Sequence, residues 1–267
     1  PTRHPDRAKA RRDYVLARML EEGATDPRSY ARATAREVNV VWHDFPALAP
    51  HLAMRLRAEV QAAGRLAVTL DSATQADTEE RVARYLENFR GQIANAAVMV
   101  VDVARATVVV RVGGADFSAP LGGQVDLCSA PRSPGSALKP FAYALAMDRQ
   151  VLYPSEYLLD GTLDYGTYAP GNFDGMYRGT VTAGEALRYS LNVPALAVLE
   201  RVGAAAFQRQ LASMGIHTMP RPTADYGIGL VLGNAEVRLD ELVEAYAAME
   251  VLKSFLTFWS FSVAINS

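Results

Sequence analysis

Apolar residues near the start of the chain recur every three or four positions, which is the spacing of one helix face. This stripe predicts a helix over residues 6–22 that ends at Gly23, and its apolar members are Val15, Leu16, Met19 and Leu20. Asp26-Pro27 then predicts the start of a second, more polar helix. The first part of the chain is therefore expected to be helical.

The pattern changes beyond residue 64. Arg65–Leu70 alternates weakly and predicts a strand, and Ser72–Gln75 predicts a capping box at the head of a helix. The β-branched runs Ala96–Val101 and Thr107–Val112 are separated by a short polar break, and they predict a buried hairpin. Helical and alternating segments together predict a mixed α and β domain.

Glycine and proline mark the loops and helix starts of the remaining chain. A loop leads into a predicted helix that begins at Ser136. Residues 161–179 are rich in Gly, Tyr and Pro, and they predict a long irregular loop that shapes a cleft. Thr182–Glu185 predicts a second capping box, and Pro194 suits the first turn of another helix that ends at Gly203.

Composition and charge narrow the function classes. The 267 residues are 50% hydrophobic and 21% charged, which is ordinary for a globular protein with one large domain, or one domain plus a small appendage. A formal net charge of -2 provides no basic surplus, so we expect no nucleic-acid partner. Cys128 is the only cysteine, so no internal disulfide can form. The apolar C-terminal run is too short to span a bilayer, and we expect no membrane segment in this chain.

Ser136 and Lys139 form an S-x-x-K where a loop becomes a helix. Residues three apart share a helix face, so the Lys139 amine can reach the Ser136 hydroxyl. Unpaired N–H groups at a helix N-terminus favour the alkoxide that a serine nucleophile must form. A lysine among Ala and Leu is expected to have a lowered pKa, which suits a general base. Taken alone, the motif is also compatible with a capping serine and a surface lysine.

Ser190 and Asn192 form an S-x-N at the junction of two predicted helices. A junction exposes a hydroxyl and an amide that a helix interior would hide. Taken alone, the motif also fits a capping serine and a turn asparagine. Tyr168-Ala169-Pro170-Gly171-Asn172 resembles a loop that lines a substrate cleft, and we expect Tyr168 and Asn172 to bind substrate. A plain Gly/Pro-rich turn is the alternative.

S-x-x-K followed by S-x-N resembles the pattern of penicillin-binding proteins and serine β-lactamases. Longer segments resemble class A penicillin-binding proteins, and within them the 1C type, for which PRSPGS-LKPF and APGNFD are characteristic. The likeness covers roughly residues 1–250. Its main segments are TLDSATQ (69–75), GQVDLCSAPRSPGSALKPFAYALAMD (123–148), YAPGNFDGMYRGTVTAGEALRYSLNVPALAVLERVG (168–203) and YGIGLVLGNAEVRLDELVEAYAAM (226–249).

The resemblance implies acyl transfer on peptidoglycan stem peptides. Ser136 would attack the carbonyl of the penultimate D-Ala and release the terminal D-Ala. Lys139 would accept the serine proton, Ser190 would relay a proton to the leaving amine, and Asn192 would hold the substrate amide and orient Lys139. An amine from a neighbouring stem peptide would then resolve the ester, whereas a β-lactam would stay attached to Ser136.

The resemblance also implies fold, domains and location. We expect an α+β fold, a three-layer arrangement of helices around an antiparallel sheet. Residues 1–62 would be a helical connector that follows a glycosyltransferase domain, 63–250 an incomplete transpeptidase domain, and 251–267 a divergent tail. The parent protein would be anchored at the periplasmic face of the bacterial inner membrane. No cofactor is expected, and no metal either, because His43, His51 and His217 lie apart.

The third motif of the family, K-T-G or K-S-G, does not occur in the sequence. Lys253-Ser254-Phe255 is the nearest match, but Phe255 stands in place of the glycine and the match comes too soon after residues 245–249. The motif strand supplies contacts to the substrate carboxylate and one oxyanion-hole donor, and loss of such a donor costs roughly 10²–10³ in rate. We therefore expect cross-linking by this chain to be impaired.

Two other functions fit the same pattern. A β-lactamase or penicillin sensor would share both motifs, but Leu191 replaces the Asp of S-D-N and no glutamate for deacylation is evident. A non-catalytic remnant that binds peptidoglycan or a partner protein through the same cleft is the alternative from another class.

Overall fold

The computed structural model describes residues 4–38, 47–60, 65–89, 92–162 and 171–255. Contacts within the chain define two compact units, Pro1–Ala47 and Leu48–Ser267. The second unit thus begins within the connector expected over residues 1–62. The reason is His51 of the helix Pro50–Val60, whose buried ring lies 2.8 Å from the Gly123 carbonyl and packs edge-on against Phe117.

The first unit is a helical hairpin of α1 (Pro5–Glu21) and α2 (Pro27–Ala35). Asp26 caps α2, since its carboxylate accepts hydrogen bonds from the backbone N–H groups of Arg28 and Ser29. Arg12 donates to the carbonyl oxygens of Thr34 and Arg36 and ties the two helices together. Both predicted helices are confirmed.

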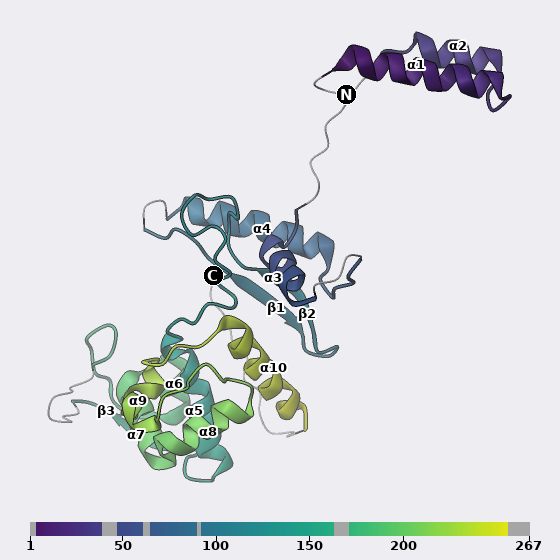
Figure 1. Ribbon diagram of the computed structural model, residues 1–267. Coiled ribbons are helices and arrows are strands. Elements are labelled where there is room, and N and C mark those ends of the chain that lie inside the picture. Colours follow the sequence, from purple (N-terminus) through teal and green to yellow (C-terminus); the bar gives the residue numbers. More distant parts are fainter. Residues whose placement is uncertain (1–3, 39–46, 61–64, 90–91, 163–170, 256–267) are drawn as a thin grey trace. The chain divides into compact units, whose positions relative to one another are not determined.

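The second unit begins with two helices and a hairpin. They are α3 (Pro50–Val60), α4 (Ser72–Glu87), β1 (Val98–Asp102) and β2 (Thr107–Val112). β1 and β2 pair antiparallel, with Val98 opposite Val112 and Asp102 opposite Thr107, so the predicted hairpin is confirmed. α4 packs on β2 through Val82, and α10 (Leu239–Phe255) contacts β1. Figure 1 shows α4 lying along the hairpin.

Two local predictions in this region were wrong. Arg65–Leu70 forms no strand, because Leu66 and Val68 are both exposed and give the segment no face to bury. The cap of α4 is Asp71 rather than Ser72, since the Asp71 carboxylate accepts from the Thr74 N–H at 2.8 Å.

Gln75 does not reach back to the helix start as the capping box required. Its buried amide accepts from the Arg111 N–H at 2.8 Å and donates to the Arg111 carbonyl at 3.1 Å. The Gln75 side chain therefore hydrogen-bonds to β2 instead of to its own helix start, and the local sequence does not show this distant partner.

The rest of the second unit is mainly helical. α5 lies inside it and is contacted by α6, α7, α8 and η2, and its residues Ala142 and Ala146 are fully buried. The elements are η1 (Gly135–Leu138), α5 (Lys139–Asp148), β3 (Tyr157–Asp160), β4 (Gly179–Thr182), α6 (Ala183–Arg188), α7 (Asn192–Val202), α8 (Ala204–Ser213), α9 (Thr223–Tyr226) and η2 (Gly227–Leu232).

Signals that depend on neighbouring residues were the most reliable in this part. The Thr182–Glu185 capping box is present, with both reciprocal hydrogen bonds. Pro194 lies in the first turn of α7, and that helix ends at Gly203, which has φ +81°. The β3–β4 pair, whose second strand begins inside the predicted loop 161–179, was not foreseen. Helices and strands together make the predicted α+β fold.

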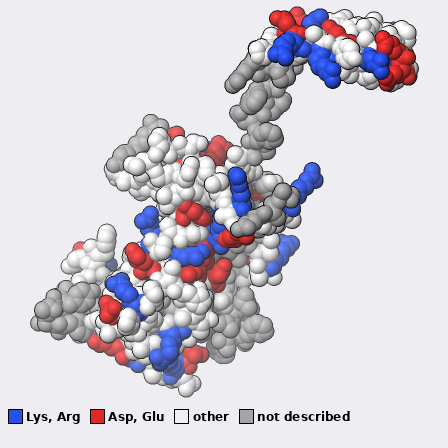
Figure 2. Space-filling view, in the orientation of Figure 1, with Lys and Arg blue, Asp and Glu red and all other residues white. Residues whose placement is uncertain are grey.

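Among the described residues, no helix combines the length and the apolar character needed to cross a membrane. Most of the expected divergent tail, from residue 256 on, lies outside the described residues. On the face drawn in Figure 2, basic and acidic side chains are interspersed.

Candidate functional site

Ser136 lies in η1, a short 3₁₀ turn, and the residue is exposed. We expected an α-helix from Ser136 onward, but the α-helix begins at Lys139. The reason is Pro140, which has no N–H to donate to the Ser136 carbonyl four positions earlier. The Lys139 N–H donates to that carbonyl instead, three positions back, as in a 3₁₀ helix.

The Ser136 turn, residues 133–137, is held by residues about a hundred positions later in the chain. The Ser133 hydroxyl donates to the Gly233 carbonyl at 2.6 Å. Gly233 has φ +88°, and a Cβ there would collide with the backbone nitrogen of Gly135, so only glycine fits. Tyr246 of α10 donates its hydroxyl hydrogen to the Ala137 carbonyl at 2.7 Å.

Lys139 is the charged group at the centre of the site. The residue is 1% exposed. The amine donates to the Ser190 carbonyl at 2.5 Å, to the Asn192 Oδ1 at 2.7 Å and to the Ser190 hydroxyl at 3.2 Å. Burial lowers the pKa of Lys139 to about 8, as the sequence predicted in direction. A hydrogen bond from Lys139 to Ser136 is not present among the described residues.

Ser190 and Asn192 lie at the junction of α6 and α7, where the sequence placed them. Ser190 is exposed and has φ +52°, a conformation that is uncommon for a residue with a side chain. This left-handed residue turns the chain so that its hydroxyl and its carbonyl both face Lys139. Lys139 of the first motif therefore meets both residues of the second around one buried amine, with Ser136 in the turn before it.

Asn172 is buried against this junction. Its side-chain oxygen accepts from the Asn192 backbone N–H at 2.8 Å, and its side-chain nitrogen donates to Asp160 and to the Met176 carbonyl. The amide that we expected to bind substrate is thus engaged in internal hydrogen bonds. Tyr168, the other expected substrate contact, lies outside the described residues.

Sequence reasoning missed three residues that shape this site: Asp160, Gly233 and Tyr246. Asp160 is the last residue of the short strand β3, and nothing in the sequence distinguishes it from other acidic residues at strand ends. Gly233 requires knowledge of which backbone approaches it, and Tyr246 has the appearance of a core residue of an apolar helix. Each acts across a long sequence separation, so no local pattern marks it.

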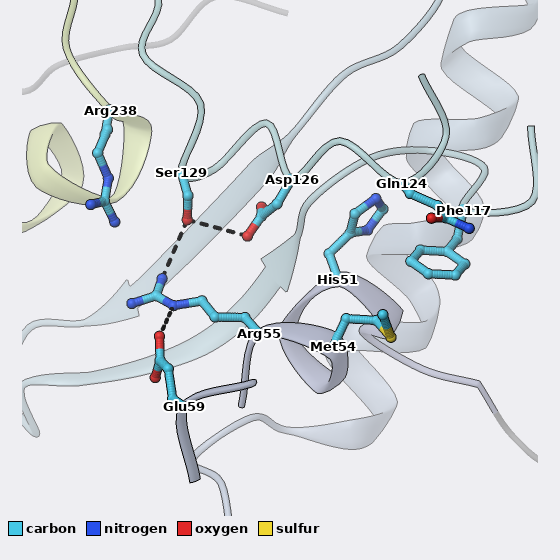
Figure 3. A pocket seen from close by; sticks show the side chains of 9 residues that line it. All are labelled: His51, Met54, Arg55, Glu59, Phe117, Gln124, Asp126, Ser129 and Arg238. Carbon is cyan, nitrogen blue, oxygen red and sulfur yellow. Dashed lines mark hydrogen bonds and ion pairs between the residues drawn. The ribbon is translucent and has the colours of Figure 1, made fainter. Parts of the chain in front are cut away.

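A cavity of about 490 Å³ lies elsewhere, between α3 and the loop that precedes the Ser136 turn (Figure 3). None of the four motif residues lines it. Its charged side chains are already paired, Arg55 with Glu59 and Asp240, Arg238 with Asp240, and Asp126 with Arg111. The cavity therefore offers no uncompensated charge to a ligand. Within the described residues, no group of three or more His, Cys, Asp or Glu could hold a metal ion.

Comparison with known sequences gives a family match that spans the residues of both motifs. The family model described as "Penicillin binding protein transpeptidase domain" matches residues 96–236. The chain is 34% identical over 252 residues to penicillin-binding protein 1C of Escherichia coli (strain K12), which covers 93% of this chain and 32% of that protein. It is 29% identical over 253 residues to penicillin-binding protein 1F of Bacillus subtilis (strain 168), covering 88% and 34% respectively. The chain thus spans about a third of the length of these curated relatives.

Solved structures share the fold at lower identity. Penicillin-binding protein 1A from Haemophilus influenzae is 18% identical with a TM-score of 0.64, over 91% of this chain and 52% of that one. The PonA1 protein from Mycobacterium tuberculosis, in complex with penicillin V, is 22% identical with a TM-score of 0.62, over 76% and 58%. At these identities the likeness shows a common fold.

Proposed function

Because the chain belongs to the penicillin-binding protein transpeptidase domain family, we propose that it carries the serine acyl-transfer site of a peptidoglycan cross-linking DD-transpeptidase. The observation that carries this proposal is Lys139, a buried amine held on Ser190 and Asn192 in the first turn after Ser136. A serine hydroxyl is a weak nucleophile, and it needs a nearby base whose proton affinity is tuned toward neutral pH. Desolvation of Lys139 supplies that tuning.

The proposed reaction uses stem peptides that end in D-Ala-D-Ala. Neutral Lys139 accepts the Ser136 proton as the serine oxygen attacks the penultimate D-Ala carbonyl. The carbon–nitrogen bond to the terminal D-Ala then breaks, and its nitrogen receives a proton through the Ser190 hydroxyl, which lies 3.2 Å from the lysine amine. An acceptor amine from a second stem peptide attacks the ester, forms the cross-link and frees Ser136.

The same serine would open a β-lactam ring. In that case the leaving nitrogen stays tethered to the acyl group, and the Ser136 ester persists. The M. tuberculosis PonA1 structure contains penicillin V, and this supports penicillin as the probe for the present chain. Asn192 would hold the amide of either substrate and keep Lys139 in place.

We further propose limits and a location for this activity. The 267 residues hold no K-T-G or K-S-G, so one oxyanion donor is lacking and acylation is slowed by roughly 10²–10³-fold. By analogy with its relatives, the site would act at the periplasmic face of the bacterial inner membrane.

A non-catalytic module that binds peptidoglycan through the same cleft is the other candidate, favoured by the lack of a Ser136–Lys139 hydrogen bond among the described residues.

The test is intact-protein mass spectrometry after incubation with a labelled penicillin, for wild type and Ser136→Ala. We expect wild type to gain the mass of one penicillin slowly and keep it, because no deacylating glutamate is evident, and Ser136→Ala to gain none. A folded wild-type chain that never gains the adduct, yet binds stem peptide as tightly as Ser136→Ala does, would point to the binding module. Rapid loss of the adduct would indicate a β-lactamase.

A further inference from the structure

The start of α7 is capped by a side chain from a distant loop. The residue at the N-cap position is Leu191, which cannot accept a hydrogen bond through its side chain. The Asn192 N–H is one of the unpaired donors of a helix start. Asn172, twenty residues earlier, accepts from it at 2.8 Å through Oδ1. The loop therefore fixes the position of the first residue of α7.

The same loop also fixes the orientation of the Asn192 amide. Nδ2 of Asn192 donates to the Gly171 carbonyl at 2.8 Å. With the nitrogen committed to Gly171, Oδ1 must face the Lys139 amine, at 2.7 Å. A flipped amide would bring two donors together at Lys139 and two acceptors together at Gly171. Gly171 and Asn172 thus hold Asn192 at both its backbone and its side chain.

The orientation of Asn172 is in turn set by Asp160. Asp160 is fully buried, and its two carboxylate oxygens lie 2.8 and 2.9 Å from Nδ2 of Asn172. It also accepts from the Arg178 N–H at 2.8 Å, and it has no ion pair with any described residue. A carboxylate repels the amide oxygen of Asn172 and attracts its nitrogen, so only one amide orientation is stable.

A buried carboxylate without a cation costs folding free energy, but it accepts through both oxygens, which a neutral amide could not do toward Asn172 and Arg178 together. The neighbourhood of Asp160 is buried. Tyr143 of α5 lies one helical turn after Lys139 and is 1% exposed, and its hydroxyl has no partner among the described residues. Burial and the nearby Asp160 charge both raise the pKa of Tyr143.

We propose that Asp160 and Asn172 are positioning residues: Asp160 orients the Asn172 amide, and Asn172 holds Asn192 so that Oδ1 stays on the Lys139 amine. This inference rests on the proposed function, because the series of hydrogen bonds from Asp160 through Asn172 and Asn192 to Lys139 would serve acyl transfer. Neither Asp160 nor Asn172 needs to touch the substrate for this role.

The first experiment measures the rate of penicillin acylation in Asn172→Ala and Asp160→Asn. Misplacement of a reacting group by about 1 Å costs on the order of 10²-fold in rate, and we expect that loss for Asn172→Ala. Asp160→Asn keeps the shape but turns an NH₂ group toward either Asn172 or Arg178, and we expect on the order of a 10-fold loss. The control is Gln75→Ala, which removes two buried hydrogen bonds to β2, and it should keep the wild-type rate.

The second experiment does not depend on acylation. The chain has three lysines, so NMR of selectively labelled lysine side chains reports the titration of Lys139, assigned by Lys139→Met. In Asn172→Ala the ammonium loses its Asn192 acceptor, and the Lys139 midpoint should fall below the wild-type value. In Gln75→Ala it should not change. If the midpoint in Asn172→Ala equals that of wild type and control, the positioning role is wrong.

The two readouts separate two kinds of failure. If wild type is never acylated but the Lys139 midpoint still moves in Asn172→Ala, the proposed function fails and the positioning chain stands. If wild type is acylated and Asn172→Ala reacts at the rate of the Gln75→Ala control, the proposed function stands and this inference is overturned.

Discussion

At the scale of single residues, the protonation state of Lys139 controls when the proposed site can react. All three hydrogens of its ammonium form are used in hydrogen bonds to Ser190 and Asn192. As an ammonium the group cannot accept a proton from Ser136. Only the neutral amine is the active base, and burial lowers the pKa of Lys139 from 10.5 to about 8.

A specific pH dependence results from this lowered pKa. Below about pH 8 the neutral fraction grows with pH, so the penicillin acylation rate should rise about 10-fold per pH unit and then level off above that pH. The measurement is the second-order acylation rate from about pH 6 to about pH 10, corrected for hydrolysis of penicillin in buffer. A rate that still climbs between about pH 8 and about pH 10, as a lysine with the ordinary pKa of 10.5 would produce, contradicts the assignment of Lys139 as base.

Lys139→Met supplies the matched control. The thioether side chain fills similar space but accepts no proton, and loss of a positioned base costs roughly 10²–10⁴-fold in rate. The residual acylation should lack the rise with pH. Because a depressed lysine pKa means that the unfolded chain binds the proton more tightly, wild-type stability should also increase as pH rises from about 8 toward the unfolded value of 10.5. Lys139→Met should lose that increase.

At the scale of elements, the contact between the end of η2 and the Ser136 turn leaves no room for a side chain. Gly233 combines a left-handed backbone with close approach to Gly135. Gly233→Ala adds a methyl group where backbone atoms already lie, so the Ser136 turn must move. We expect a stability loss above about 1 kcal/mol and an acylation rate lower by on the order of 10²-fold.

Gly215→Ala separates the two causes. Gly215 has φ +95°, but nothing lies within 4 Å of its Cβ position. This variant should lose stability through backbone strain alone and keep its acylation rate. Thermal unfolding and penicillin labelling of both variants are the measurements. Equal acylation rates in the two variants would show that the Ser136 turn does not depend on Gly233.

The helices and strands also show which features of the fold can be predicted from the sequence. The two N-terminal helices, the end of α7 at Gly203, the Thr182 capping box and the β1–β2 hairpin depend on residues close in sequence, and these predictions are confirmed. Membership in the penicillin-binding protein family is confirmed as well. Gln75 and Arg65–Leu70 were predicted wrongly, because a tertiary partner and a lack of burial decided their structure.

The motif residues were found because the family resemblance named them, and the structure brings Lys139, Ser190 and Asn192 within hydrogen-bond distance. Their supports were not found. Asp160 and Gly233 act through contacts that no periodic pattern encodes, and Pro140 changes the helix start in a way that the S-x-x-K spacing conceals. The roles assigned to the expected site residues all stay predictions: Ser136, Lys139, Ser190, Asn192, Tyr168 and Asn172.

At the scale of the whole second unit, one carboxylate joins distant segments. Asp240, at the start of α10, accepts hydrogen bonds from Arg238 through both carboxylate oxygens, at 2.9 and 2.6 Å. It also accepts from Arg55 of α3 at 3.3 Å. Arg111 of β2, 4% exposed, lies 3.6 Å away. α10 also carries Tyr246, so this cluster links the hairpin to the Ser136 turn.

Removal of this charge should therefore destabilise the unit broadly. Asp240→Asn leaves Arg111 with less compensation in the interior, but Arg111 keeps its 2.8 Å pair with Asp126, so we expect a loss of about 1–3 kcal/mol. The measurement is urea unfolding, with Asp77→Asn as the control, because the Asp77–Arg81 pair is exposed and should contribute nothing measurable. If both variants unfold at the same urea concentration, Asp240 is not the link that we infer.

Acid should act in the same direction. Burial raises the pKa of Asp240, but the hydrogen bonds and charge of Arg238, with Arg111, outweigh burial, so the net pKa is below 3.8. The stabilisation is complete above the unfolded value near 3.8 and is lost as pH falls through the lower folded value. The stability difference between wild type and Asp240→Asn should accordingly shrink below that range.

The long reach of these contacts has a consequence for how the protein folds. Lys139 meets Ser190 across 51 residues, Ser133 meets Gly233 across 100, and Tyr246 meets Ala137 across 109. Closing loops of this length is slow, because the chain loses conformational entropy before the new contacts contribute any favourable free energy. The helices can form early from local signals, but the Ser136 turn is assembled only when both ends of this stretch have met. If Ser136 is acylated as proposed, a β-lactam would therefore react only with fully folded molecules, and newly made or half-folded copies would escape it.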